Sequence, residues 1–256
     1  MRSTSRRPKR GPEILLRRSP AEKEESMPNH VESTTEEPSQ TLTEIAQPAS
    51  LPRLGMAAPA FEAVTTHGKI RLEDYKGGWV VLFSHPADFT PVCTSEFLAF
   101  AAIAPELRER GVELLGLSID SPSSHIAWVR NIKEKFGIDI PFPIIADSNK
   151  EVASRYGMVM PGESKTETSR CVFVIDPAGI VRAMIYYPLT TGRNTDEIIR
   201  LIDALQTTDK HGVATPANWK PGDKVIVPPP GTMEEVEARL KAGFECTDWY
   251  FCKKSV

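Results

Sequence analysis

The sequence lacks long apolar runs and a strong charge imbalance, and each absence excludes a class of protein. No apolar stretch approaches the roughly 20 residues needed to cross a bilayer, and Ile14-Leu15-Leu16 is too short for a signal-peptide core. A net charge of −3 over 256 residues gives no reason to expect nucleic acid as a partner, and base-reading motifs are absent. We therefore expect a cytoplasmic protein that binds neither membrane nor nucleic acid.

Cysteine is scarce: the four cysteines stand at positions 93, 171, 246 and 252. They form no Cys-x-x-Cys pair and lack the spacing of zinc ligands, so no metal site is expected. Redox chemistry at individual thiols is favoured over a structural disulfide framework.

Three regions differ in composition. Residues 1–50 are poor in large apolar side chains and rich in Ser, Thr, Glu and Pro, which predicts a disordered tail. Residues 51–211 alternate between strand-like and helix-like patterns, which indicates an α/β fold with helices on both faces of a mixed sheet. We expect strands at 79–83, 112–119, 142–146, 171–175 and 181–187. We expect one helix from Pro91 to just before Gly111 and further helices at 122–136, 149–156 and 195–205. In the second helix we expect an apolar face made of Ile126, Val129, Ile132 and Phe136.

Residues 212–256 have the character of an arm. The segment WKPGDKVIVPPP is rich in proline and glycine, and a short helix at 233–241 precedes the aromatic tail GFECTDWYFCKKSV. An exposed tail of this kind would be an apolar patch, so we expect it to pack on a second subunit.

The stretch PADFTPVCTSE places a cysteine between a buried strand and a helix. Thr90 is suited to be the N-cap, and Pro91 is tolerated at the first helical position. Cys93 then falls in the first turn, where unpaired N–H groups and the helix dipole favour a thiolate. This predicts a nucleophile, whereas a buried apolar cysteine is the common fate of a free thiol.

These residues resemble the active site of the peroxiredoxins, whose motif Pro-x-x-x-Thr-x-x-Cys is matched by Pro86, Thr90 and Cys93. The resemblance runs from about residue 54 to the C-terminus and implies a thioredoxin-like fold. The sequences SHP at 84–86 and TGRN at 191–194, together with the C-terminal arm, resemble the one-Cys-type, peroxiredoxin-six-like subgroup.

The resemblance implies a thiol peroxidase that reduces hydrogen peroxide and organic hydroperoxides through a cysteine sulfenic acid. Arg170 matches the catalytic arginine of the family, which would hold the thiolate and stabilise the transition state. Thr90 would supply a hydroxyl and Cys93 its own N–H, while Pro86 would shield the thiolate from water. No cofactor is needed, because the sulfur carries both electrons.

Three further residues have two interpretations each. His85 either binds peroxide and tunes the cysteine or is a hydrogen-bonded structural histidine. Glu96 either orients Arg170 or is an ordinary first-turn acid. Arg193 matches a second arginine of the family near the pocket, or is a loop cation before a helix.

The resemblance also suggests how the sulfenic acid is resolved. Its subgroup pattern points to Cys252 of the partner chain, with Cys246 as the second candidate, and hence to a homodimer or a larger ring recycled by thioredoxin or a similar reductant. In a helical tail, the six-residue spacing would put these two about 240° apart, so they would not pair readily. Cys171 points to the opposite strand face from Arg170 and is expected in the core.

Two other functions remain. A thioredoxin-like disulfide reductase is disfavoured because Thr90 stands where the first cysteine of a Cys-x-x-Cys pair would be. A redox sensor, or a holdase chaperone built from ring-shaped oligomers, is a role that family members can adopt besides catalysis.

Overall fold

The computed structural model describes residues 51–256, so the tail expected at 1–50 lies outside the described residues. The main sheet has seven strands in the order β2-β1-β5-β4-β3-β6-β7. Its strands are β1 (Glu62–Thr65), β2 (Gly68–Arg71), β3 (Trp79–Ser84), β4 (Val112–Ser118), β5 (Ile144–Ala146), β6 (Arg170–Ile175) and β7 (Val181–Tyr187). The helices are η1 (Leu72–Tyr75), α1 (Pro91–Glu109), α2 (Pro122–Phe136), α3 (Glu151–Arg155), α4 (Thr195–His211) and α5 (Met233–Lys241).

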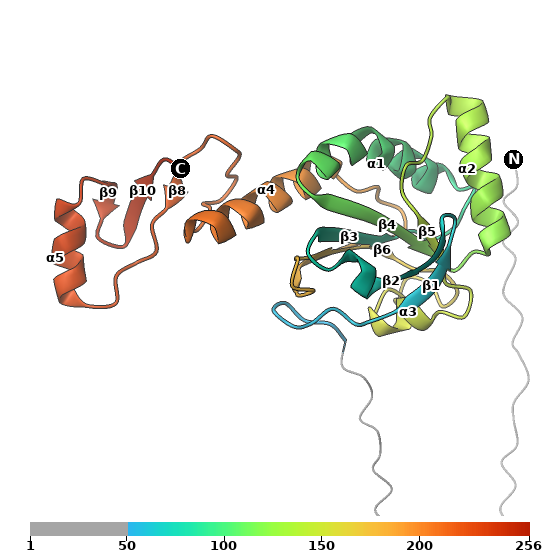
Figure 1. Ribbon diagram of the computed structural model, residues 1–256, viewed down its shortest axis with the longest axis horizontal. Coiled ribbons are helices and arrows are strands. Elements are labelled where there is room, and N and C mark those ends of the chain that lie inside the picture. Colours follow the sequence, from blue (N-terminus) through green and yellow to red (C-terminus); the bar gives the residue numbers. More distant parts are fainter. Residues whose placement is uncertain (1–50) are drawn as a thin grey trace, which may run out of the picture. The chain divides into compact units, whose positions relative to one another are not determined.

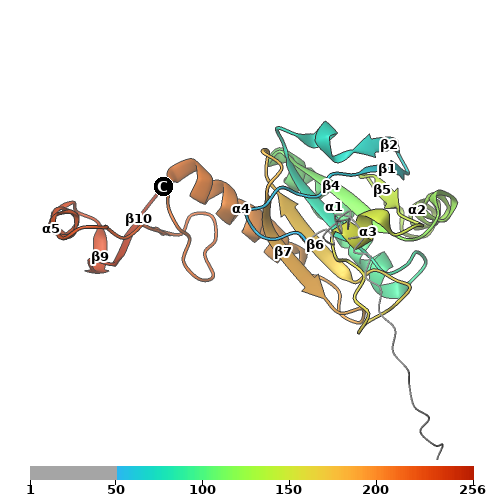
Figure 2. The same ribbon diagram turned by 90° about the horizontal axis from the view of Figure 1, so that it is seen from below.

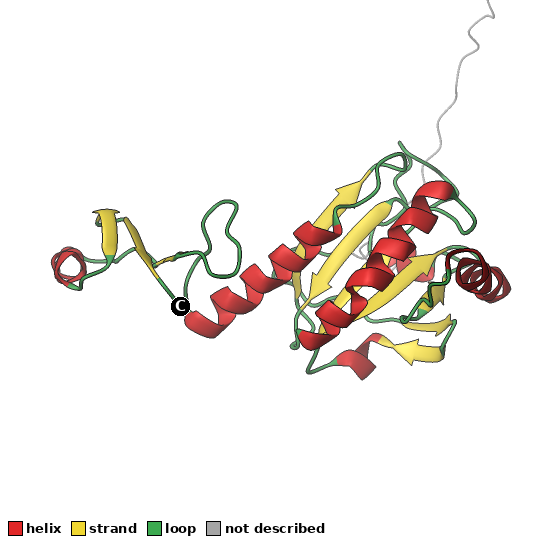
Figure 3. Ribbon diagram, turned by 90° about the horizontal axis from the view of Figure 1, so that it is seen from above, coloured by secondary structure: helices red, strands yellow, loops and turns green. Residues whose placement is uncertain are grey.

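The sheet is mixed, as the alternating pattern predicted. Strands β3, β4 and β5 run parallel, whereas β6 pairs antiparallel with both β3 and β7. Helices α1 and α4 lie on one face and contact each other (Figure 1, Figure 3), and α3 lies on the other face (Figure 2). The predicted fold class is therefore confirmed.

Period-two alternation in the central strands divides the core between the two faces. On β3, Val81 and Phe83 join the cluster beneath α1 and α4, whereas Val80 and Leu82 join the cluster on the α3 side. All six residues of β3 are buried, because helices cover one side and the α3 region covers the other. The strand that leads to Cys93 is thus a rigid part of the core.

The predicted elements are present, but some of their ends differ from the prediction, and so does the buried face of α2. Helix α4 continues to His211, and β5 begins only at Ile144. On α2 the predicted apolar face is wrong in part: Ile132 is buried and Val129 packs against the core, but Ile126 and Phe136 are 49% and 52% exposed. The buried side chains of α2 are instead His125, Trp128 and Ile132. A histidine occupies this face because its ring is hydrogen-bonded inside the protein, as described below.

The hairpin β1–β2 was missed from the sequence. Its strands are short, half-exposed and at the edge of the sheet, so they carry little apolar pattern. Gly68 has a φ of +105° at the turn, a conformation that a glycine adopts without strain.

The C-terminal tail forms strands, and the helical arrangement considered above is wrong. A small sheet has the order β8-β10-β9, built from β8 (Val225–Ile226), β9 (Glu245–Asp248) and β10 (Phe251–Lys254). Aromatic and β-branched residues favour strands here. Cys246 lies opposite Cys252 in the β9–β10 register, and the two form a disulfide. They therefore pair readily, contrary to the expectation for a helix.

Within residues 51–256, no helix is long and apolar enough to cross a membrane.

Candidate active site

Cys93 is held at the junction of β3 and α1. Strand β3 ends at Ser84, the loop 85–90 follows, and Cys93 is the third residue of α1. Its side chain is fully buried, and its thiol is free. Pro86 is also buried in this loop. Phe89 has a φ of +56°, a strained value for a residue other than glycine, and such conformations persist only where the surroundings fix them.

Thr90 occupies the N-cap position, but its side chain does not cap the helix. Its hydroxyl donates to the carbonyl oxygen of Ala87 at 2.9 Å. The expected capping bond is therefore absent. The N–H groups in the first turn of α1, where Cys93 lies, receive no hydrogen bond from the Thr90 side chain. With its proton engaged, Thr90 Oγ1 still offers lone pairs that can accept a hydrogen bond from a peroxide O–H.

A buried guanidinium lies beside the cysteine. Arg170, the first residue of β6, places Nη1 3.4 Å from Cys93 Sγ and 2.7 Å from Glu96 Oε2. Its Nε and Nη2 donate to the carbonyl oxygen of Leu189 at 2.9 and 2.8 Å. Four donor contacts fix the plane of this arginine, so its charge is aimed at the sulfur before any substrate arrives.

Glu96 connects two arginines and is not an ordinary first-turn acid. Arg193 donates to its carboxylate from the backbone N, Nε and Nη2 at 2.7–2.9 Å, and Arg170 adds a fourth bond. Burial alone would raise the pKa of Glu96, but the charges and hydrogen bonds of Arg193 and Arg170 hold it below the usual value. Two guanidiniums and one carboxylate leave a net charge of +1, which a thiolate at Cys93 would balance.

Arg193 is part of this network, and its interpretation as a loop cation does not fit its surroundings. Its Nη1 donates to the carbonyl oxygens of Ser84 and Cys171 at 2.8 and 2.9 Å. Its guanidinium lies 5.1 Å from the ring centre of Phe83 and 5.2 Å from that of Phe100. Arg193 therefore ties the end of β3 to β6 behind the cysteine and holds Glu96 in place.

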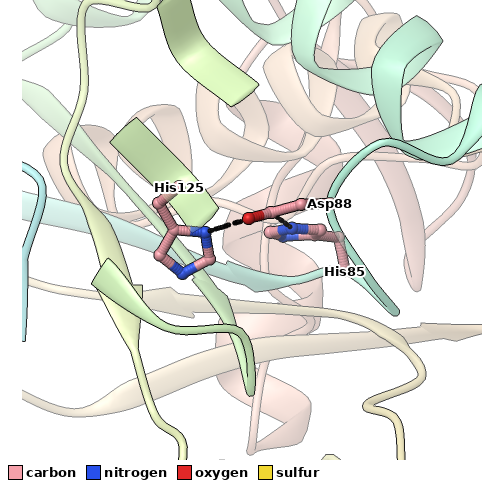
Figure 4. Close-up of side chains that lie close together, drawn as sticks. All are labelled: His85, Asp88 and His125. Carbon is pink, nitrogen blue, oxygen red and sulfur yellow. Dashed lines mark hydrogen bonds and ion pairs between the residues drawn. The ribbon is translucent and has the colours of Figure 1, made fainter. Parts of the chain in front are cut away.

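His85 belongs to a second buried cluster, which includes two residues that the sequence reasoning missed (Figure 4). Asp88 Oδ1 lies 3.1 Å from His85 Nε2, and Asp88 Oδ2 lies 2.8 Å from His125 Nδ1. His125 Nε2 faces the carbonyl oxygen of Ile145 at 3.2 Å. Two signals were available in the sequence: an aspartate three residues after His85 in the same short loop, and a histidine within the apolar pattern of 122–136.

The charges in this cluster are set by burial and hydrogen bonding. Burial lowers the pKa of His85, against the opposing effect of Asp88, so its ring is neutral. Burial would raise the pKa of Asp88, but hydrogen bonds from His125 and His85 lower it far below its usual value. His85 then donates from Nε2 to Asp88, and its buried Nδ1 has no partner among residues 51–256.

The three side chains of this cluster also have the proximity of metal ligands, since their donor atoms lie within 4.8 Å of one another. Their hydrogen bonds already account for the arrangement, because Asp88 is paired with both rings. We therefore describe the cluster as a hydrogen-bonded support for His85.

The other cysteines lie in different environments. Cys171 is buried on the α3 side of the sheet, as predicted, and burial raises the pKa of its thiol to about 11. Such a thiol is a poor nucleophile. Cys246 and Cys252 are bonded to each other in the β9–β10 hairpin. The structure thus brings together Cys93, Thr90, Pro86, Arg170, Glu96 and Arg193, with His85 in the adjacent cluster.

Together, the mixed sheet and the buried cysteine at a helix start beside a fixed guanidinium define a thiol-dependent oxidoreductase. The comparisons with known proteins agree. Residues 54–184 match the AhpC/TSA family, and residues 204–243 match the C-terminal domain of 1-Cys peroxiredoxin. A peroxiredoxin of Aquifex aeolicus is 64% identical over 218 residues, which cover 81% of this chain and 98% of the relative.

Solved structures give the same result. A yeast mitochondrial 1-Cys peroxiredoxin superposes with a TM-score of 0.73 at 45% identity, covering 80% of this chain and 100% of the other. A cysteine-to-serine mutant of peroxiredoxin 6 of Arenicola marina superposes with a TM-score of 0.72 at 40% identity, covering 79% and 97% of the two chains. The chain belongs to the AhpC/TSA family, and it is a peroxidase of the peroxiredoxin type.

Proposed function

We propose that Cys93 is the peroxidatic cysteine and that Arg170, Thr90 and Pro86 assist it. Hydrogen peroxide or an organic hydroperoxide enters with its O–H donated to Thr90 Oγ1. The thiolate of Cys93 attacks the nearer oxygen, and the O–O bond breaks. The leaving oxygen takes a proton and departs as water or an alcohol, while the sulfur becomes a sulfenic acid.

The observation that carries this proposal is the contact of 3.4 Å between Arg170 Nη1 and Cys93 Sγ. A charged donor at this distance holds the thiolate and can also face the negative charge that develops on the leaving oxygen. Glu96 and Arg193 are positioning residues, since they fix Arg170 and the end of β3 without lying against the sulfur. His85 supplies a neutral, polar wall.

We further propose that the sulfenic acid is resolved by Cys252 of the partner chain, with Cys246 as the second candidate. The tail offers an apolar surface for a second copy, because Trp249, Tyr250 and Phe251 are 39%, 56% and 38% exposed. We therefore assign residues 51–211 to the peroxidase domain and 212–256 to a dimerisation arm, in a homodimer or a larger ring.

A disulfide product needs a dithiol reductant, for which we propose thioredoxin or a similar protein. The solved yeast relative is described as resolving its thiol through glutathione and thioredoxin systems, which supports a reductant of this class. A cycle that depends on reduced thiols fits a cytoplasmic location.

The test compares fully reduced wild-type protein with Cys252→Ser after one equivalent of hydrogen peroxide, using a sulfenic-acid trap and peptide mass spectrometry. We expect the trap to label Cys93 strongly in Cys252→Ser and weakly in the wild type and in a Cys171→Ala control. Turnover with thioredoxin should be lost in Cys252→Ser. Equal labelling of Cys93 in all three proteins would contradict the role of Cys252, and labelling at another residue would contradict that of Cys93.

A further inference from the structure

The tail disulfide joins two cysteines that the fold keeps adjacent. Cys246 on β9 and Cys252 on β10 are direct cross-strand partners, with Cα atoms 4.0 Å apart. Backbone pairing holds this proximity whether or not the sulfurs are bonded. Each thiol is therefore always near the other, and any electrophilic sulfur formed at one of them meets an internal nucleophile at once.

The two tail cysteines differ in their surroundings. Cys252 is fully buried on the central strand of the small sheet, whereas Cys246 is only partly buried on the edge strand β9. The other residues of this strand, Glu245, Thr247 and Asp248, are exposed. An external protein dithiol can therefore approach the tail disulfide from the side of Cys246.

Cys93 has no such access, because its side chain is fully buried beneath the loop 85–90. A disulfide formed with Cys93 would be hard for a protein reductant to reach directly. It would, however, have a good leaving group at its Cys93 end. A thiolate there is stabilised by Arg170 Nη1 and by the start of α1, and a stabilised thiolate departs more readily in thiol–disulfide exchange.

We propose that Cys246 is a third redox thiol, which transfers the disulfide from the active site to the tail. This inference rests on the proposed resolution of Cys93 by Cys252. The thiolate of Cys246 attacks Cys252 Sγ in the Cys93–Cys252 disulfide; the Cys246–Cys252 bond forms, the bond to Cys93 breaks, and its electron pair leaves with Cys93 as a thiolate. No net oxidation occurs in this step. A protein dithiol such as thioredoxin then reduces the tail disulfide and is itself oxidised.

The test follows fully reduced full-length proteins after one equivalent of hydrogen peroxide, quenched by acid over a time course and mapped without reduction. In the wild type and in Cys171→Ala, the Cys93–Cys252 linkage should be transient and the Cys246–Cys252 linkage should be the end product. In Cys246→Ser, Cys93–Cys252 should persist and run as a covalent dimer on a non-reducing gel. Turnover with thioredoxin should fall in this variant, while the first oxidation of Cys93 keeps its rate.

Two results would overturn the relay. One is a wild-type protein in which Cys93–Cys252 persists as stably as in Cys246→Ser. The other is a Cys93→Ser protein whose tail disulfide forms as fast as in the wild type, since peroxide would then oxidise the tail directly. Failure of the underlying proposal has a different signature: Cys93–Cys252 would form in none of the proteins, including Cys246→Ser.

Discussion

Replacing Arg170 with methionine should separate the chemistry of the site from its stability. Methionine keeps the apolar, unbranched stem of the arginine side chain but removes every donor. The lost contact with Cys93 Sγ is 3.4 Å long, and at an effective dielectric constant of about 20 two unit charges at this distance attract by about 5 kcal/mol. Only part of this attraction energy contributes to lowering the activation free energy. Removing one preorganised donor typically costs about 10²–10³ in rate, and we expect the reaction of Cys93 with peroxide to slow by that factor.

The stability of Arg170→Met should fall much less. Glu96 keeps its three hydrogen bonds to Arg193, so no buried carboxylate is left without a cation. The main loss is at the carbonyl oxygen of Leu189, which gives up both of its donors. An unsatisfied carbonyl costs about 1–3 kcal/mol. This corresponds to about 2–4 °C of Tm for each kcal/mol in a domain of this size.

The assay is single-turnover consumption of hydrogen peroxide by the reduced protein under rapid mixing, with Tm measured in parallel. Arg182→Met is the matched control. This arginine on β7 also makes several bonds to carboxylates, at 2.7 Å to Asp209 and 3.2 Å to Asp176, but it does not contact the cysteine. It should lose stability and keep its rate. A fall of less than tenfold for Arg170→Met, or equal falls for both variants, would refute the reasoning.

Three further predictions concern the neighbours of Cys93. Glu96→Gln should lower the free energy of unfolding by about 3–5 kcal/mol, because it removes the carboxylate that the two guanidiniums share. An unchanged urea midpoint would contradict a stabilising role for this shared carboxylate. Thr90→Val should slow peroxide consumption about 10- to 100-fold by removing a hydrogen bond to a reacting group, and Thr90→Ser should restore the rate; a Ser variant as slow as the Val variant would argue against a role for the hydroxyl. The pKa of His85 is lowered in the folded protein, so the unfolded chain binds a proton that the folded chain does not at pH values below about 6.5. Stability should therefore fall as the pH falls from about 6.5 towards the folded-state pKa, and His85→Gln should weaken this slope in Tm measured from pH 5 to 8; identical slopes would contradict the buried, neutral ring.

Much of the central fold could be predicted because its signals are local. Strand β3 is a continuous apolar run, and the boundaries predicted for α2 and α5 agree with those of the structure. The hairpin β1–β2 carries no comparable pattern, and its pairing with β5 joins segments about 80 residues apart. The buried face of α2 was misjudged because a histidine counts as polar in a periodicity argument, and only its distant partner Asp88 makes it a core residue.

The site shows the same division between local motif and distant contact. Pro86, Thr90 and Cys93 stand within one short segment, so their spacing was enough to identify them. The choice between two roles for Glu96 and Arg193 could not be made from the sequence, because their bonds join positions 97 residues apart. The pairing of Cys246 with Cys252 depended on whether the tail was helix or strand. It also depended on a register shift between Phe251 and Cys252, because a regular hairpin that turns at Trp249 and Tyr250 would place Cys246 opposite Lys253.

The most direct measurement for the central claim is the stoichiometry of peroxide consumption by the fully reduced protein, with and without Cys93. The account predicts that the wild type consumes the first equivalent per chain in a fast phase and that a trapping reagent labels Cys93 at the earliest time points. Cys93→Ser should show no fast phase. A fast phase that survives in Cys93→Ser would contradict the assignment of Cys93 as the thiol that reacts with peroxide.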